Sequence, residues 1–137
     1  MIGIVVVTHS GLGEALIEAA ESILEDHLEA GTAVSVDLRQ SAGRLREKIK
    51  TGIKRVDKGE GVLILTDMFG GTPSNLSLSF LEEGRIEVLT GVNLPVLIRA
   101  ARMRKDKSLS ELAGGLQAYG RKSISLASGV LKGNKKN

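Results

Sequence analysis

Two kinds of hydrophobic pattern alternate along the chain, one typical of buried strands and one typical of amphipathic helices. An unbroken apolar, largely β-branched run over residues 2–8 predicts a strand buried on both faces, and residues 61–66 repeat it. Shorter strands are expected over residues 33–37 and 86–90. Between these runs, apolar residues recur every three or four positions, which is typical of amphipathic helices. The pattern therefore predicts strands and helices in alternation.

Helix boundaries are indicated by capping residues. A helix is expected from Leu12 onward, and a second one, marked by apolar residues from Leu45 to Val56, is expected to end near residues 58–59. Asn93 can cap a helix after the fourth strand, and Ser108 with Glu111 has the sequence pattern of a capping box. These signals predict a helix after the first, second and fourth strands, and one further helix behind them.

Two other segments are less regular. Residues 76–80 alternate apolar side chains with serines, as a strand would. Thr72 as N-cap followed by Pro73 favours a helix instead, which is the structure we expect there. Residues 121–127 are expected to form a last, partly polar strand, and residues 129–137 a frayed basic tail.

Strands that alternate with helices form a parallel sheet with helices on both faces. In such sheets ligands bind beyond the carboxyl ends of the strands, where neighbouring connections leave for opposite faces. His9 follows the first predicted strand and Asp67 follows the third. If these two strands are adjacent, both side chains lie at the ligand-binding edge.

The composition fits one globular domain. The chain has 137 residues, of which 42% are hydrophobic and 26% charged. No apolar run reaches the roughly 18 residues of a membrane helix, and the apolar start lacks the basic residues of a signal peptide. We therefore expect a cytoplasmic protein without membrane insertion. The absence of cysteine excludes disulfides, thiolate zinc sites and cysteine nucleophiles.

Charge is distributed unevenly along the chain. Residues 1–98 carry 9 Lys and Arg against 14 Asp and Glu, whereas residues 99–137 carry 10 against 2. A basic cluster over residues 99–107 could contact phosphates or an acidic protein, or be a solvated helix end. With aromatic residues at 2%, little is available for stacking on nucleic acid bases, so nucleic acid is the least favoured partner. The cluster consists of Arg99, Arg102, Arg104, Lys105 and Lys107.

His9 has the chemistry of a phosphoryl acceptor. It precedes a predicted helix whose N-terminal amide groups and dipole favour a nearby anion. Neutral imidazole is a good nucleophile toward phosphorus. Asp67, hydrogen-bonded to one ring nitrogen, would fix the tautomer and stabilise the positive charge that develops on phosphorylation. The alternative is that His9 is a partly exposed turn residue and Asp67 a loop or cap carboxylate.

Residues 70–73 form a second candidate phosphate-binding segment. Gly70 and Gly71 offer backbone donors in a flexible loop, and Thr72 adds a hydroxyl at the start of another predicted helix. The same residues also suit a tight turn between a strand and a helix. Both interpretations can hold at once.

Rival phosphate and metal motifs are weaker. Residues 11–16 match the first two glycines of the dinucleotide-binding fingerprint but have Leu16 at the third position. No Gly-x-x-x-x-Gly-Lys-Ser/Thr sequence occurs, which excludes a P-loop. His9 and Asp67 would give a metal only two ligands, so we expect no metal and no cofactor.

Three motifs follow one another in order along the chain. They are Ile-Val-Val-Val-Thr-His-Ser at residues 4–10, Leu-Thr-Asp-Met-Phe-Gly-Gly-Thr-Pro-Ser-Asn at 65–75, and Thr-Gly-Val-Asn-Leu-Pro at 90–95. Together they closely resemble the EIIA domain of the mannose-type (mannose/fructose/sorbose) phosphoenolpyruvate-dependent sugar phosphotransferase system (PTS). On this basis we assign the EIIA-like domain to residues 1–128 and a basic, disordered tail to residues 129–137.

The resemblance implies a flavodoxin-like three-layer fold, with four parallel strands in the order 2-1-3-4. An antiparallel C-terminal strand, here residues 121–127, would be exchanged between the subunits of a homodimer. The resemblance also implies that His9 accepts a phosphoryl group from phospho-HPr and passes it to an EIIB protein for sugar uptake, with Asp67 orienting the ring. The phosphoryl site would be lined by Ser10, Gly71 and Thr72.

Two features depart from the family pattern. Met68 stands where many relatives have a small hydroxyl residue, so one phosphoryl contact would be missing or supplied by Thr72. Many relatives continue into an EIIB domain, whereas this sequence has a short basic tail, so the acceptor would be a separate protein or absent. In the second case the protein would be a regulatory interaction module, because a phosphoryl group on His9 would change which partner docks.

Overall fold

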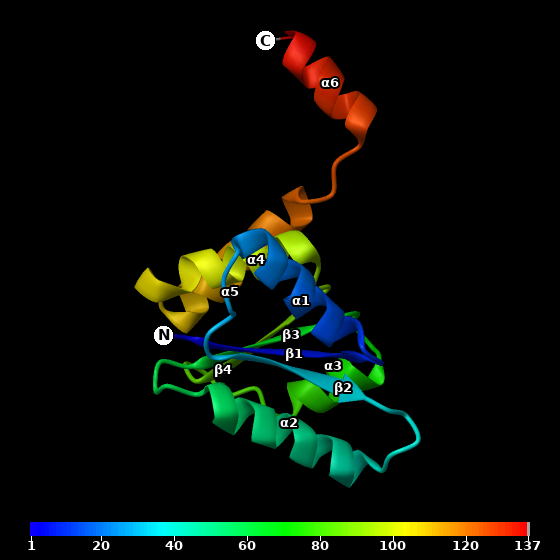
Figure 1. Cartoon of the computed structure of the whole chain (residues 1–137), viewed down its shortest axis with the longest axis vertical. Coiled ribbons are helices and arrows are strands. Elements are labelled where there is room, and N and C mark those ends of the chain that lie inside the picture. The colour runs from blue at the N-terminus through cyan, green and yellow to red at the C-terminus, as the bar shows by residue number, and fades with distance from the viewer. Residues whose placement is uncertain (137) are drawn as a thin grey trace.

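Parallel strands form the centre of the structure, which is a computed structural model. The structure describes residues 1–136 of the chain and the side chains of residues 1–133. Within these residues there are four strands, in the order β2-β1-β3-β4 (Figure 1). Every pair is parallel, which confirms the flavodoxin-like arrangement and its strand order. The strands are β1 (Gly3–His9), β2 (Gly31–Val36), β3 (Val62–Thr66) and β4 (Ile86–Thr90).

Helices cover both faces of the sheet, as the alternating pattern predicts. Figure 1 shows α1, α4 and α5 on one face and α2 and α3 on the other. The helices are α1 (Leu12–Leu24), α2 (Ala42–Val56), α3 (Thr72–Leu78), α4 (Leu94–Met103), α5 (Leu109–Lys122) and α6 (Ala127–Lys136), with a short 3-10 helix over Arg104–Asp106.

The first strand explains why the core has two halves. Its residues from Gly3 to Thr8 are all buried, so successive side chains enter opposite layers. Ile4 and Val6 pack in the cluster that includes α1, α4 and α5, whereas Val5 and Val7 pack in the cluster that includes α2. Burial on both faces is what the continuous β-branched run predicts.

Helix starts follow the capping signals closely. The Asn93 side chain accepts a hydrogen bond from the Val96 amide at 2.9 Å, and the capping box of Ser108 and Glu111 is formed in both directions. The third helix begins one residue early: Gly71 is its N-cap, and Thr72 is its first residue. The early start follows from Gly70, whose positive φ of 89° turns the chain before Thr72 is reached.

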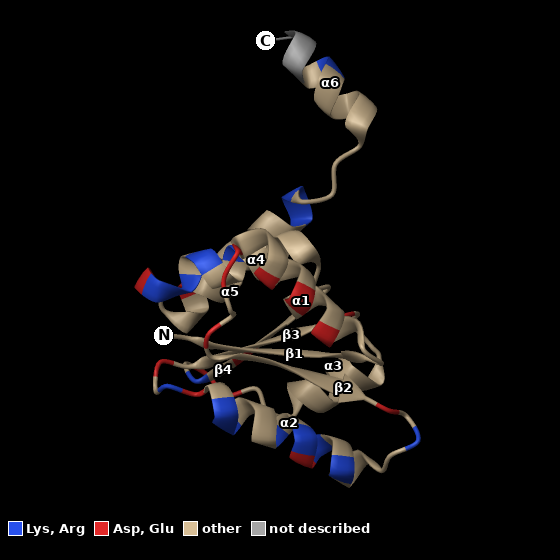
Figure 2. Ribbon diagram, in the orientation of Figure 1, with Lys and Arg blue, Asp and Glu red and all other residues tan. Residues whose placement is uncertain are grey.

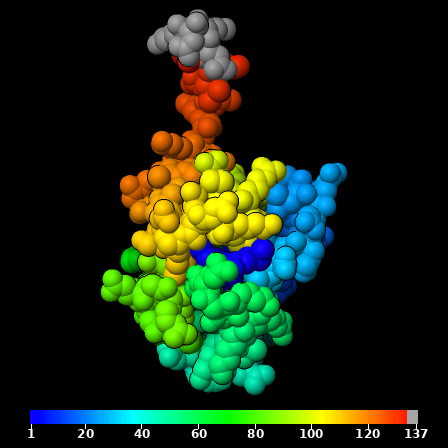
Figure 3. All heavy atoms as spheres, turned by 90° about the vertical axis from the view of Figure 1, so that its left-hand side faces the viewer, coloured from blue at the N-terminus to red at the C-terminus, as the bar shows by residue number. Residues whose placement is uncertain are grey.

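The C-terminal segment differs from the prediction. Residues 121 and 122 belong to the last turn of α5, and residues 124–126 have no regular structure. A strand needs a partner for its backbone groups, and within the described single chain these residues have none. We expected residues 129–137 to form a frayed tail. In the structure residues 127–136 form α6, which projects away from the sheet (Figures 1 and 3). Residue 137 lies outside the described residues.

Arg104 corrects the interpretation of the basic cluster at residues 99–107. Its side chain is 3% exposed and donates hydrogen bonds to the carbonyl groups of Ile2 at 3.2 Å and Ala30 at 3.4 Å, as well as to that of Glu29. Burial lowers the pKa of Arg104, and the nearby charge of Glu29 opposes this effect. Arg104 therefore joins the 3-10 helix to the starts of β1 and β2 instead of contributing to a surface patch.

Candidate phosphoryl-transfer site

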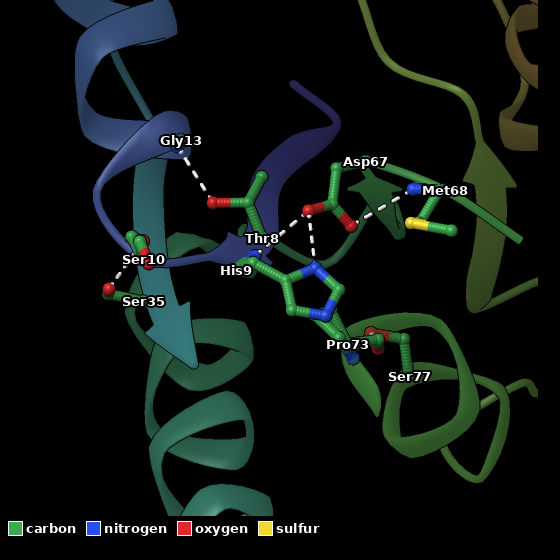
Figure 4. Close-up of polar contacts among 9 residues, drawn as sticks. All are labelled: Thr8, His9, Ser10, Gly13, Ser35, Asp67, Met68, Pro73 and Ser77. Atoms are coloured by element: carbon green, nitrogen blue, oxygen red, sulfur yellow. Dashed lines mark hydrogen bonds and ion pairs between the residues drawn. The ribbon is translucent and has the colours of Figure 1, made fainter. Parts of the chain in front are cut away.

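The sheet brings His9 and Asp67 together. Because β1 pairs with β3 and Val7 lies opposite Thr66, the residues that follow reach the carboxyl edge side by side. The His9 Nδ1 atom lies 2.8 Å from the Asp67 Oδ2 atom (Figure 4). Adjacency of the first and third strands was the condition on which the predicted pairing depended, and the structure meets it.

Asp67 is held by three polar groups. Besides the His9 ring, its Oδ2 atom accepts a hydrogen bond from the His9 amide at 2.9 Å, and its Oδ1 atom accepts one from the Met68 amide at 2.9 Å. Burial raises the pKa of Asp67, but the hydrogen bonds from His9 and Met68 outweigh it and bring the pKa below its ordinary value. Asp67 is therefore ionised at neutral pH.

The ionised carboxylate determines which nitrogen of His9 is free. A carboxylate only accepts hydrogen bonds, so the Nδ1 atom that faces it carries a proton. In a neutral imidazole the Nε2 atom then has a free lone pair. The His9 side chain is 35% exposed and that of Asp67 is 12% exposed, so the ring is accessible while its partner is shielded.

Gly71 lies against the ring of His9. A Cβ atom at this position would lie 2.9 Å from the His9 Cε1 atom and 3.5 Å from its Nε2 atom. The first distance is shorter than a van der Waals contact, so any side chain here would displace the ring. At Gly71, therefore, only glycine fits beside the Nε2 edge of the ring without a shift of the ring.

The turn between β1 and α1 is held by two hydroxyl groups that sequence reasoning missed. The Thr8 Oγ1 atom accepts a hydrogen bond from the Gly13 amide at 2.8 Å, and the Ser35 hydroxyl donates to the Ser10 carbonyl (Figure 4). Ser10 itself has a positive φ of 48°. The contact at Thr8 occupies one of the free amide groups at the start of α1 and fixes this helix beside His9.

The remaining predicted site residues lie in the turns around the ring. Ser10 is exposed in the β1–α1 turn, and Gly70 and Thr72 flank Gly71 in the β3–α3 turn. Asn75 donates a hydrogen bond to the Gly70 carbonyl at 3.4 Å, which braces this second turn. The structure therefore places Asp67 and Gly71 in contact with His9, and the others in the two loops beside it.

Comparison with known proteins identifies the family. The family model described as "PTS system fructose IIA component" (EIIA-man) matches residues 3–116. The chain belongs to this mannose-type EIIA family. It is 31% identical to the PTS system fructose-specific EIIA component of Bacillus subtilis, over 93% of this chain and 88% of that protein.

One further relative and one solved structure are similar to this chain. The chain is 33% identical to the PTS system mannose-specific EIIAB component of Escherichia coli K12, over 90% of this chain but 38% of that longer protein. The crystal structure of phosphotransferase system component EIIA from Streptococcus agalactiae superposes with a TM-score of 0.82 at 24% identity, over 93% of this chain and 98% of that one. The second comparison shows the same fold.

Met68, which we expected to depart from the family pattern, lies beside Gly71. Its side chain is 57% exposed, and its Cγ atom lies 3.5 Å from the position that a Cβ on Gly71 would take. Phe69, the next residue, is 74% exposed. Two exposed apolar side chains therefore follow Asp67 directly in the β3–α3 turn.

His27, the second histidine of the chain, lies outside this site. It contacts Glu21, with 2.9 Å between the His27 Nδ1 and Glu21 Oε2 atoms, and its side chain is 82% exposed. In residues 1–136 no group of three or more His, Asp and Glu side chains is arranged to hold a metal ion. None of the helices in this part of the chain is both long enough and apolar enough to span a bilayer.

Proposed function

We propose that this EIIA protein is a cytoplasmic phosphocarrier that accepts a phosphoryl group on His9 from phospho-HPr and transfers it to an EIIB protein for sugar uptake. The contact of 2.8 Å between His9 Nδ1 and Asp67 Oδ2 is the observation that carries this proposal. It presents the Nε2 atom as the nucleophile and provides a negative charge on the opposite side of the ring. Membership of the EIIA family supports the same assignment.

The transfer step follows from this geometry. The lone pair of His9 Nε2 forms a bond to phosphorus, and the electron pair of the broken bond returns to the donor. The ring keeps its proton on Nδ1 and becomes positively charged, and Asp67 stabilises that charge because its carboxylate lies 2.8 Å away. Transfer to EIIB reverses these steps and restores the neutral ring.

The negative charge of the phosphoryl group has donors nearby. The N-terminus of α1 begins three residues after His9, and its dipole places partial positive charge at this edge of the sheet. The connection from β3 to α3 offers further donors, namely the amide groups of Gly70 and Gly71 and the hydroxyl of Thr72 at the start of α3. We propose that these groups and Ser10 hold the phosphoryl oxygens.

Incubation with phosphoenolpyruvate, Enzyme I and HPr tests this function. We expect one acid-labile phosphoryl group per chain, lost in His9→Ala and retained in His27→Ala, because His27 lies at the other end of α1. Labelling that survives His9→Ala would contradict the proposal. If the group forms on His9 but no EIIB accepts it, and it changes protein binding instead, the regulatory module is the correct function.

We also propose a homodimer in which residues after α5 pair with β4 of the second subunit. β4 is the last strand of the sheet and is half-buried along its length. Ile124 and Leu126, which follow α5, are 85% and 77% exposed. Burial of these side chains against a second copy would remove apolar surface from water and complete the sheet.

A further inference from the structure

A basic groove lies at the end of the sheet opposite His9. Its cavity has a volume of about 510 Å³ and lies between α2 and the connection from α3 to β4. Gly61 and Ile86 line it, and Gly61 adjoins β3, whose other end leads into Asp67. With about 3.3 Å per strand residue, the groove is roughly 15 Å from the phosphoryl-transfer site. It is therefore a separate feature of the molecule.

Positive charge converges on this groove from two segments. Lys50 and Lys54 lie one turn apart on α2, and Arg85 comes from the α3–β4 connection. Figure 2 shows the Lys and Arg residues concentrated along α2, and Figure 3 shows α2 beside the yellow-green α3–β4 connection. Arg46, one turn before Lys50, extends the stripe and lies over the Phe80 ring at 5.0 Å.

Little negative charge opposes these cations. Asp57 is the one carboxylate among the described residues that line the cavity, and its Oδ1 atom accepts a hydrogen bond from the Gly59 amide at 2.8 Å. In the described part of the chain Lys50 and Lys54 form no ion pair, whereas Arg85 forms a long one with Glu82, with 4.0 Å between the Nε and Oε1 atoms. Three neighbouring cations repel one another unless an anion lies between them.

The bottom of the groove is apolar. Ile53 is 8% exposed, and Phe80 and Ile86 are half-buried beside it. A cavity of this volume is within the range of about 300–1,000 Å³ that small-molecule sites occupy, and such sites combine apolar walls with a few placed polar groups. A bare inorganic anion would leave these apolar walls unused.

We infer that this groove binds an organic phosphate with a flat apolar group, the phosphate contacting Lys50, Lys54 and Arg85 and the flat group packing on Ile53, Phe80 and Ile86. The ligand class follows from the two halves of the groove, cations at the rim and an aromatic and aliphatic floor. The site is independent of the phosphocarrier function, because none of its residues contacts His9 or Asp67.

Calorimetric titration with adenosine 5′-monophosphate (AMP) tests this inference. We expect saturable binding that is at least about tenfold tighter than binding of adenosine, glucose 6-phosphate or inorganic phosphate, since each of these lacks one half of the ligand. Lys54→Ala and Arg85→Ala should each weaken AMP binding about tenfold, the effect of losing one charge-assisted contact. Both side chains are exposed, so the variants are expected to fold, which their thermal unfolding will show.

Matched variants separate the groove from the rest of the molecule. Lys122→Ala removes an exposed cation from α5 and should leave AMP binding unchanged, and so should His9→Ala. The inference is wrong if AMP binds no more tightly than inorganic phosphate, or if Lys54→Ala and Arg85→Ala bind it normally. Loss of AMP binding in His9→Ala would place the ligand at the phosphoryl-transfer site and would also overturn the inference. Failure of phosphorylation at His9 would leave these results unaffected.

Discussion

At the scale of single residues, the contact between His9 and Asp67 determines what the site can do. The ionised carboxylate requires a proton on the Nδ1 atom, which leaves the Nε2 atom with the free lone pair that our proposal assigns as the nucleophile. The same carboxylate accepts backbone hydrogen bonds from His9 and Met68, which keep it ionised and fixed in position. One side chain thus sets the tautomer, the orientation and the charge of the ring.

Replacing Asp67 by Asn tests this arrangement through pH. The folded protein lowers the pKa of Asp67, so this residue adds stability that is present above its ordinary value of 3.8 and lost as pH falls through the folded value. In urea unfolding, Asp67→Asn should be less stable than the unaltered protein near about pH 7, and the difference should shrink toward about pH 3. A difference that is constant over this range would contradict the assignment.

The same variant should also slow phosphorylation. Loss of a group that orients a functional histidine typically costs about 10- to 100-fold, and we expect this reduction in the rate of labelling by phospho-HPr. The chain should remain folded, because the amide oxygen can still accept a backbone hydrogen bond.

Gly71 provides a steric prediction. In Gly71→Ala the new Cβ atom would meet the His9 Cε1 atom at 2.9 Å and push the ring away from its place beside Asp67. A shift of this kind can cost about 100-fold in rate, so labelling should fall strongly. Gly43→Ala is the matched control, because no atom lies within 4 Å of the added Cβ and its labelling rate should be normal. Equal rates in the two variants would show that Gly71 has no steric role.

At the scale of secondary-structure elements, Arg104 joins parts of the chain that are far apart in sequence. Its guanidinium group donates to backbone carbonyl groups before β1 and before β2, while it extends from the 3-10 helix that follows α4. Arg104→Met removes all of these hydrogen bonds and should lower the free energy of unfolding by about 1–3 kcal/mol. The Ala30 carbonyl would keep its hydrogen bond from the Ile4 amide at 2.9 Å, so the loss falls on the carbonyl groups of Ile2 and Glu29.

The neighbouring residue supplies the control for Arg104. Lys105 is exposed on the same 3-10 helix, so Lys105→Met should change stability by no more than about 0.5 kcal/mol. Urea unfolding of the two variants gives the comparison. If both lose the same stability, the buried hydrogen bonds of Arg104 are not the cause.

The elements differ in how well the sequence predicts them. The strand over Gly3–His9 and the caps at Asn93 and Ser108 depend on local patterns, and these were predicted correctly. The segment over residues 121–127 was expected to be a strand and is instead divided between α5 and an irregular stretch. A strand depends on a neighbour, and the identity of that neighbour is not a local property of the sequence.

The site shows the same limit at finer scale. His9 and Asp67 could be paired from the sequence because both follow buried strands, and only strand adjacency had to be assumed. The roles of Thr8 and Ser35 could not be predicted from the sequence. No sequence pattern marks a buried threonine or a strand serine as a residue that supports a turn. The burial of Arg104 was missed because a cation in a basic run is usually solvated.

At the scale of the whole molecule, the charges are separated by helix. Residues 1–38 contain seven acidic residues and no Lys or Arg, whereas residues 39–58 contain eight Lys and Arg and two acidic residues. The acidic residues Glu14, Glu18 and Glu21 lie on α1, whereas α2 on the opposite face of the sheet carries mainly Lys and Arg (Figure 2). Further basic residues lie on α4 and the 3-10 helix, on the same face as α1. A partner that docks at His9, as we propose, would meet the acidic α1 on one side of the sheet and the basic α2 on the other.

The apolar residues after α5 give a prediction about assembly. If they pair with β4 of a second copy, the unaltered chain should sediment as a dimer, and the double substitution Ile124→Ser with Leu126→Ser should favour the monomer. These side chains are 85% and 77% exposed in the single chain, so the change leaves the folded subunit intact. A monomer for the unaltered chain at every concentration tested would contradict the dimer.

The central claim, that Nε2 of His9 carries the phosphoryl group, can be tested directly by NMR. The chain has two histidines, so a sample with ¹⁵N-labelled histidine gives four ring nitrogen signals to follow during phosphorylation by phosphoenolpyruvate, Enzyme I and HPr. We predict that the Nε2 signal of His9 acquires coupling to phosphorus, that its Nδ1 atom stays protonated, and that the His27 ring is unchanged. A phosphoryl group on Nδ1 of His9, or on His27, would contradict the account.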